Sequence, residues 1–296
     1  MEKAGFSGIV AFKAGMTHVG VIEHRDTGSK GNEVIRPATI LEIPKMKVYG
    51  IRLYSKKNSY TEPKSDFYSA EEAAKLGIKK TENTIAKLAD SKKDVSGLTD
   101  AAALVYFDGA TTGSGNKRVM RLELHVGGKD VSEKIAFIES QMGKEINVKE
   151  FATEGEYLDM TAVTKGRGWA GVIKRFGVAR LVRKATQKTR HVGTLGAWHP
   201  PKVLYTVPHA GHMGFNYRTE INKRLLKVGT IADVKEVAMK GGILNYGIVK
   251  SDFLIVDGSI PGVSKRLIRI RKAMRPSRTE AKPELKYISL ESKQGA

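Results

Sequence analysis

The sequence has 296 residues, of which 51 are lysine or arginine, 31 are aspartate or glutamate and none is cysteine, so its formal net charge is +20 at pH 7. Without cysteine, disulfide bonds, thiolate metal sites, iron–sulfur clusters and a cysteine nucleophile are excluded. The chain contains no apolar run near the ~20 residues that cross a bilayer and no secretory signal pattern. We therefore expect a cytoplasmic protein that has no membrane partner.

The positive charge is concentrated in the second half of the sequence. Residues 1–159 carry 24 basic and 23 acidic residues, whereas residues 160–219 carry 11 basic residues and no acidic one. Residues 220–296 carry 16 basic and 8 acidic residues. Because an acid-free segment of this length repels itself, it needs a polyanion to neutralise it, and we expect that polyanion to be nucleic acid.

The first part of the chain is predicted to be β-structure. Residues 5–24 suggest two short strands around a turn at Ala14-Gly15. Valine, isoleucine and tyrosine between glycine or proline residues predict further strands over 34–43 and 48–54.

Between residues 55 and 150 the pattern becomes mixed α/β. Ser69 and Glu72 have the spacing of a capping box for a short helix that Gly77 can end. Ser132 can cap another helix, which Gly143 ends. The stretch also predicts a weak helix over 84–89 and strands over 103–107 and 119–126.

After a predicted strand over 157–164, residues 185–218 resemble a long loop, and long loops inside compact proteins are usually functional or disordered. Strands are then predicted over 242–249, 253–256 and 266–271. In the last of these, the strand period of two places Ile268 and Ile270 on one face and Arg269 and Arg271 on the other.

Residues 166–171 read G-R-G-W-A-G and match the G-x-G-x-x-G pattern of dinucleotide-binding loops. Those loops need an acidic residue ~20 positions later, but the first acid after Asp159 is Glu220. A kinase glycine loop is also excluded, because no H-R-D or D-F-G motif follows. We interpret the segment as a close-approach loop in which backbone amides and neighbouring cations reach phosphates together.

Four histidines and a tryptophan lie in the acid-free segment. Metal binding by His191, His199, His209 and His212 is disfavoured, because no carboxylate or thiolate accompanies them. Tryptophan is usually a core residue, but Trp198 lies between glycines and a proline pair, with no apolar strand or helix to join. An exposed indole that stacks on RNA bases is the better interpretation.

Long motifs identify the chain as similar to one family, the ribosomal large-subunit protein three family in its archaeal form. The strongest are K-G-R-G-W-A-G-V-I-K-R-F-G (165–177) and G-A-W-H-P (196–200). Further matches are A-F-K-A-G-M-T-H (11–18), R-T-E-I-N-K-R (218–224), G-G-I-L-N-Y-G (241–247), G-S-I-P-G-V-S-K-R-L (258–267) and Y-I-S-L-E-S-K-Q-G (287–295).

The resemblance implies a mainly β fold with an α/β insertion. A closed antiparallel β-barrel of the translation-protein type would comprise residues 1–54, 150–164 and 219–296, with an inserted α/β subdomain over 55–149. Residues 165–218 would form a long basic extension that penetrates rRNA toward the peptidyl transferase centre, with Trp198 near its tip.

The resemblance also implies a structural protein of the large ribosomal subunit that binds large-subunit (23S) rRNA, acts in early assembly and contacts neighbouring large-subunit ribosomal proteins. It implies no enzymatic activity, cofactor, metal or small-molecule substrate. The alternative is a free-standing RNA chaperone or translation-factor-like RNA-binding protein. The residues expected to bind rRNA are Lys165, Arg167, Trp169, Lys174, Arg175, Arg180, Arg183, Lys184, Lys188, Arg190, His191, Trp198, His199, Lys202, His209, His212, Arg218, Lys223, Arg224, Arg269 and Arg271.

Overall fold

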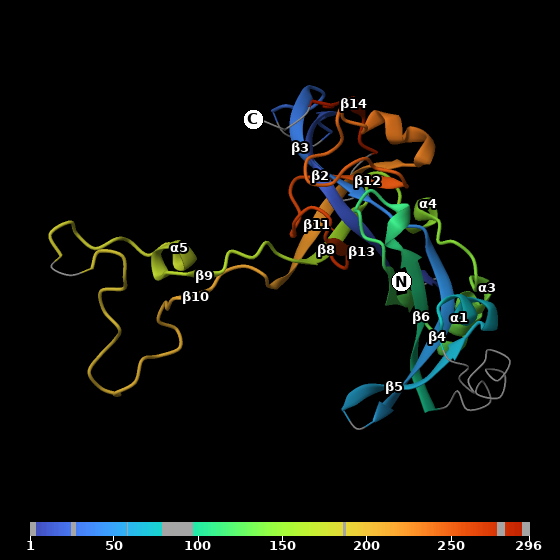
Figure 1. Cartoon of the computed structure of the whole chain (residues 1–296), viewed down its shortest axis with the longest axis horizontal. Helices are drawn as coiled ribbons and strands as arrows, with labels where there is room; N and C mark the ends of the chain where they lie inside the picture. Colours follow the sequence, from blue (N-terminus) through green and yellow to red (C-terminus); the bar gives the residue numbers. More distant parts are fainter. Residues whose placement is uncertain are drawn as a thin grey trace. The chain divides into compact units, whose positions relative to one another are not determined.

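The computed structural model describes residues 4–24, 28–57, 59–78, 97–185, 188–276 and 282–291. This part of the chain is mainly β-structure with a few short helices (Figure 1). It divides into two compact units: unit 1 comprises Met1–Ala162 and Thr219–Ala296, and unit 2 comprises Val163–Arg218. The helix predicted over 84–89 lies outside the described residues.

Unit 1 contains a seven-stranded sheet whose pairings close on themselves. The strand order is β13-β8-β11-β12-β3-β2-β14, and an additional pairing joins β13 to β2. Six of these strands therefore form a ring within the described residues, and β14 lies along the second half of β2. The bounds are β2 (Gly8–Ile22), β3 (Glu33–Glu42), β8 (Tyr157–Val163), β11 (Tyr217–Gly229), β12 (Phe253–Asp257), β13 (Leu267–Lys272) and β14 (Leu285–Ile288).

The predicted strands over 34–43, 253–256 and 266–271 are confirmed as β3, β12 and β13. In β13, Ile268 and Ile270 are fully buried while Arg269 and Arg271 are exposed, so the predicted alternation is also confirmed. Burial of such branched side chains contributes about 1.5–3 kcal/mol each.

The turn predicted at Ala14-Gly15 is wrong, because β2 runs through this position as one strand of 15 residues. Its pairing with β3 shifts register between Lys13 and Gly15, as at a β-bulge. A Cβ atom at Gly15 would lie 2.5 Å from Cγ2 of Ile243. The glycine therefore permits a close approach between distant segments instead of making a turn.

The strand predicted over 242–249 is also wrong. This segment consists of turns with one isolated bridge between Ile243 and Gly247. Positive φ angles of +81° at Gly242 and +61° at Asn245 turn the chain back on itself. Its apolar residues resemble a strand in sequence, but left-handed residues interrupt any extended run.

A second, five-stranded sheet of unit 1 has the order β1-β7-β6-β4-β5. Because β4 lies in this sheet, the sheet begins before residue 55, where we expected the α/β part to start. Its strands are β1 (Gly5–Phe6), β4 (Met46–Lys57), β5 (Tyr60–Tyr68), β6 (Leu98–Asp108) and β7 (Val119–Gly127). The accompanying helices are α1 (Ala70–Lys75), η3 (Gly109–Thr111), α3 (Val131–Ser140) and α4 (Val148–Phe151), and unit 1 also contains η4 (Ile231–Glu236).

Both predicted helix positions are confirmed by α1 and α3, but the capping box predicted for α1 and the Ser132 cap predicted for α3 are wrong. Ser69 occupies the N-cap position of α1 without a side-chain hydrogen bond. The carboxylate of Glu72 instead accepts a hydrogen bond from Tyr106 of β6. In α3 the N-cap residue is Asp130, so Ser132 lies inside the first turn.

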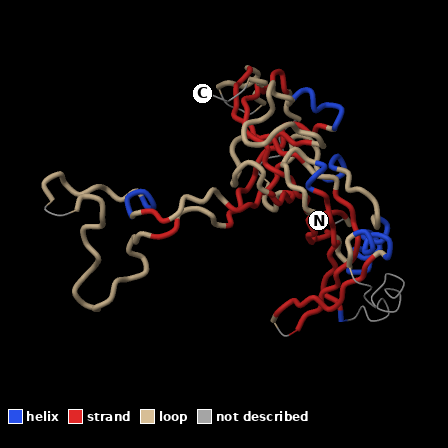
Figure 2. Tube along the Cα trace, in the orientation of Figure 1, coloured by secondary structure: helices blue, strands red, loops and turns tan. Residues whose placement is uncertain are grey.

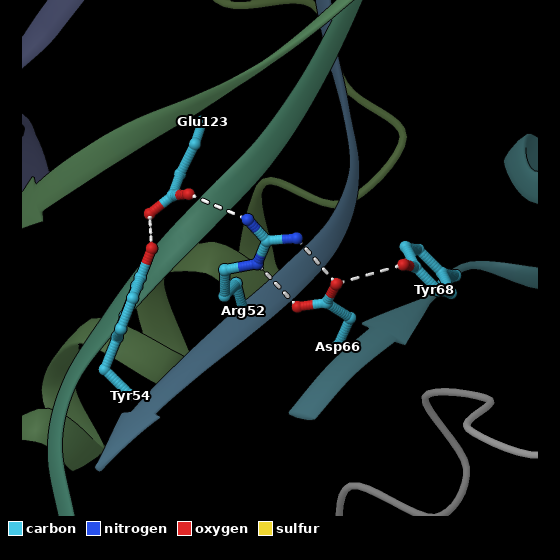
Figure 3. A network of polar contacts seen from close by, with 5 residues as sticks. All are labelled: Arg52, Tyr54, Asp66, Tyr68 and Glu123. Carbon is cyan, nitrogen blue, oxygen red and sulfur yellow. Dashed lines mark hydrogen bonds and ion pairs between the residues drawn. The ribbon is translucent and has the colours of Figure 1, made fainter. Parts of the chain in front are cut away.

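Five side chains form a polar network on one face of the five-stranded sheet (Figure 3). Arg52 donates two hydrogen bonds of 2.7 Å to Asp66 and one of 3.1 Å to Glu123. Tyr54 donates to Glu123, and Tyr68 donates to Asp66. The hydrogen bond from Arg52 lowers the pKa of Asp66, whereas burial and the Glu123 carboxylate raise the pKa of Tyr54 to about 12.

We expect Asp66→Asn to lower the free energy of unfolding by ~1 kcal/mol near neutral pH, because a two-pronged ion pair is lost. The folded-state pKa of Asp66 lies below its ordinary value of 3.8. The stabilisation is therefore present above that value and disappears as the pH falls through the folded-state pKa. Urea unfolding should show the wild type and the variant converging in acid.

The matched control is Glu62→Gln, since Glu62 forms an exposed ion pair of 3.7 Å with Lys57 on the same sheet. It should change the unfolding free energy by less than ~0.5 kcal/mol at any pH. If the difference in unfolding free energy between Asp66→Asn and the wild type stayed constant at low pH, it would contradict a stabilising role for the Arg52–Asp66 ion pair.

Candidate nucleic-acid interface

The first and last segments of unit 2 pair with each other to form a narrow ribbon. At its far end, β9 (Trp169–Ala170) pairs with β10 (Gly211–His212), and the Trp169 ring meets the His212 ring edge-on at 5.2 Å between centroids. The rest of the ribbon is joined by backbone hydrogen bonds from Thr164 to Asn216 (2.9 Å), Phe215 to Lys165 (3.2 Å), Arg167 to Met213 (2.9 Å) and Met213 to Gly168 (2.9 Å).

Glycines allow the two segments of the ribbon to approach each other closely. Gly168 and Gly214 have φ angles of +67° and +72°. A Cβ atom at Gly214 would collide with the carbonyl oxygen of Lys165. The glycine pattern of residues 166–171 therefore forms one side of a tight ribbon that leads into a helix, with Lys165 and Arg167 exposed beside it.

The short helix α5 (Val172–Phe176) is fixed to the ribbon by an arginine. Arg175 Nη1 donates a hydrogen bond of 2.9 Å to the carbonyl of His209, and its guanidinium lies 5.0 Å from the centre of the Phe176 ring. A Cβ atom at Gly211 would come within 2.6 Å of the same nitrogen. Arg175 therefore has a structural role in addition to its predicted contact with RNA.

The remainder of unit 2 has almost no core. Figure 2 shows it drawn almost entirely as loop. Among the described residues of unit 2, only Ala170, Val172 and Gly211 are buried. Its large apolar side chains are exposed instead, including Trp198 at 87% and Tyr205 at 97%. The others are Trp169, Phe176, Val182, Leu195, Val203, Leu204, Phe215 and Tyr217.

The structure gathers most of the predicted RNA-binding residues on this unit. Every predicted residue in unit 2 is exposed to solvent, from Lys165 to Arg218, and none of them lies near a carboxylate of the same unit, since the segment contains none. Arg269, on β13, is also exposed.

Arg224 differs from the other predicted residues, because it is only 3% exposed and the free protein does not present its guanidinium at the surface. Two other predicted cations are already engaged within unit 1. Lys223 forms an ion pair of 2.6 Å with Glu220, and Arg271 one of 3.1 Å with the buried Asp159, which faces it across β8 and β13. The charge pattern could not reveal the Arg271 pair, because it depends on the register between β8 and β13, whereas Lys223 and Glu220 lie three residues apart in β11.

Sequence reasoning missed the exposed aromatic residue Tyr205. The signal was available, since Tyr205 lies in the same acid-free segment as Trp198 and also lacks an apolar strand or helix to join.

Within the described ranges, no group of three or more histidine, aspartate or glutamate side chains is placed to hold a metal ion. The same part of the chain contains no helix that is both long and apolar enough to span a bilayer.

A cation-rich, carboxylate-free unit with exposed aromatic side chains is typical of the nucleic-acid-binding class of proteins. Comparison with known proteins identifies the family. The model of the family "Ribosomal protein L3" matches residues 55–295. The chain is 38% identical to large ribosomal subunit protein uL3 of Methanococcus vannielii, over 99% of this chain and 90% of the relative.

The uL3 protein of Methanoregula boonei is 39% identical, over 97% of this chain and 88% of the relative. That of Methanocorpusculum labreanum is 38% identical over the same shares. The chain therefore belongs to the uL3 family of large-subunit ribosomal proteins, and its relatives carry the names of ribosomal proteins, not of enzymes.

Proposed function

We propose that the chain is a non-catalytic structural protein of the cytoplasmic large ribosomal subunit that binds large-subunit rRNA chiefly through unit 2. The observation that carries the proposal is the composition and exposure of this unit. It presents 11 lysines and arginines without a single carboxylate, together with exposed aromatic rings. RNA offers both complements, since phosphates neutralise the cations and unpaired bases stack on the rings.

The binding would be led by shape and charge. Side chains cannot read base edges in the deep major groove of an RNA helix, so lysine and arginine bind mostly phosphates and sugars. Aromatic side chains add about 1–3 kcal/mol for each base that they stack on. Trp198 and Tyr205 are the most exposed aromatic rings of the unit and suit this role.

Several finer features belong to the same proposal. The six-strand ring would be the closed translation-protein-type barrel, built from residues 1–54, 150–164 and 219–296, and residues 55–149 would be the inserted subdomain. The extension over 165–218 would reach toward the peptidyl transferase centre and join the subunit early in assembly, beside neighbouring ribosomal proteins. Family membership and the closed ring of pairings support these assignments.

The alternative function is a free-standing RNA chaperone or translation-factor-like protein, which acts in trans and turns over. Sedimentation of the tagged protein with large subunits at high salt distinguishes the two. A structural component remains in the subunit fraction at one copy per subunit. A chaperone leaves that fraction as the salt concentration rises, because exposed phosphate contacts weaken with salt.

The Trp198→Ala variant should retain the melting temperature of the free protein but enter large subunits poorly in the same sedimentation assay. The indole is 87% exposed, so its removal leaves no cavity. A core tryptophan would instead cost ~3–5 kcal/mol on truncation. A large drop in melting temperature together with normal subunits would contradict this placement.

A further inference from the structure

Two loops of unit 1 form a second surface that contains cations without carboxylates. Residues 109–122 and 237–251 include no aspartate or glutamate. The acids that flank these loops have other partners. Glu123 binds Arg52 and Tyr54, Glu236 binds Lys227, Asp252 accepts from the amide of Ile231, and Asp108 accepts from the amide of Ala110.

A buried carboxylate holds the two loops together. Glu42, the last residue of β3, is fully buried. It accepts hydrogen bonds from the Gly113 amide (2.9 Å) in the first loop, and from the Lys250 amide (2.6 Å), the Tyr246 hydroxyl and the Ser251 amide (2.9 Å) and hydroxyl (3.0 Å) in the second. These donors are all neutral. Because a buried carboxylate is costly unless it is fully hydrogen-bonded, its burial here fixes both loops against β3.

The loops also interlock at backbone distance. A Cβ atom at Gly113 would collide with the carbonyl oxygen of Ile248, and Gly247 has a φ angle of +114°. Within the first loop, the buried hydroxyls of Thr112 and Ser114 lie 2.8 Å apart and hydrogen-bond to each other. The two loops are therefore already ordered in the free protein, so binding a partner loses little conformational entropy there.

The side chains that this surface presents suit a polyanion. Lys117, Arg118, Lys240 and Lys250 are exposed, and in the described part of the chain none of them forms an ion pair. In the second loop, Ile248 is 61% exposed.

We propose that these Glu42-anchored loops form a second RNA-binding surface, in which the four cations neutralise phosphates and Ile248 packs against sugars. The inference rests on the proposed function, because it takes RNA as the partner. It adds a preformed site on unit 1 to the loop-like site on unit 2, and it makes Glu42 a positioning residue for RNA binding.

The test is the salt dependence of binding between the full-length protein and transcribed large-subunit rRNA. The variant replaces Lys117, Arg118, Lys240 and Lys250 by glutamine. Its log–log slope should be shallower by about 3, at ~0.7–0.9 for each of the four lost phosphate contacts, and its affinity should fall at least about tenfold at low salt. The control removes the same charge elsewhere on unit 1, at the exposed residues Lys56, Lys64, Lys129 and Lys144, and should leave the slope nearly unchanged.

A second comparison separates this inference from the proposed function. A unit 2 variant, with Arg180, Arg183, Lys184 and Lys188 replaced by glutamine, is measured beside the loop variant. If only the unit 2 variant loses affinity, the loop surface is refuted while the proposed function stands. If neither loses affinity, both fail. A loop variant that binds rRNA normally but no longer enters subunits would mark a protein contact and also overturn the inference.

Glu42→Gln tests the positioning role with an almost isosteric side chain. The NH₂ group of glutamine must face a backbone N–H of one loop, and two donors repel each other. That loop should therefore shift away from β3, and the salt slope should flatten as in the loop variant. Tyr246→Phe removes a single hydrogen bond and should act in the same direction, more weakly. A folded Glu42→Gln protein with the wild-type slope would refute the positioning role.

Discussion

Replacing Arg180, Arg183, Lys184 and Lys188 by glutamine is expected to weaken rRNA binding by roughly a hundred- to a thousandfold near ~0.1 M salt. These side chains lie exposed in a unit without carboxylates, so no internal partner competes for them. Each phosphate that they neutralise releases condensed counterions, and the entropy of this release drives the association.

The salt dependence gives the same prediction a second readout. For about 6–10 phosphate contacts, the wild-type log–log slope should lie between roughly −4 and −9, and the variant should be shallower by about 3. The melting temperature of the free protein should not fall, because removing unpaired like charges relieves repulsion. A wild-type slope near zero would refute the role of unit 2 as a polyanion-binding unit.

The strands that sequence alone predicted well are those whose signal is local. β12 and β13 are short runs of branched residues, and alternation along β13 assigns its two faces. The turn predicted at Ala14-Gly15 failed because the glycine serves a distant contact. Gly15 accommodates Ile243, which lies far along the chain, and no local pattern separates that use from a turn.

The candidate interface shows the same difference between local signals and contacts of distant residues. The charge of unit 2 is a property of composition, so the sequence revealed it directly. The buried state of Arg224 and the pairing of Arg271 with Asp159 depend on strand register, which composition does not contain. Glu42 was missed because a single carboxylate at a strand end has no distinguishing pattern, although its hydrogen bonds join segments about 70 and 200 residues away.

The two surfaces differ in how much order they have before binding. The loops anchored by Glu42 are fixed by buried hydrogen bonds. In unit 2, the ribbon and α5 are held by backbone bonds and by Arg175, whereas residues 178–208 bury none of their described side chains. Ordering the backbone costs about 1–2 kcal/mol per residue, and so little burial cannot offset that cost. RNA phosphates would supply both the missing countercharge and the contacts that keep this segment ordered.

Limited proteolysis should therefore cut the free protein first between residues 180 and 190, where trypsin finds Arg180, Arg183, Lys184, Lys188 and Arg190. Proteases cleave segments that open locally at low cost, and no described residue between 178 and 208 is buried. Arg175 provides an internal control, because its guanidinium is bound to the His209 carbonyl and it lies within α5. It should be cleaved later, and the sheets of unit 1 should resist longest.

In the large subunit the same sites should be protected, since bound RNA would order them. If the free protein resists cleavage at 180–190 as strongly as in its sheets, the segment folds without RNA, and the proposal that RNA orders it is wrong.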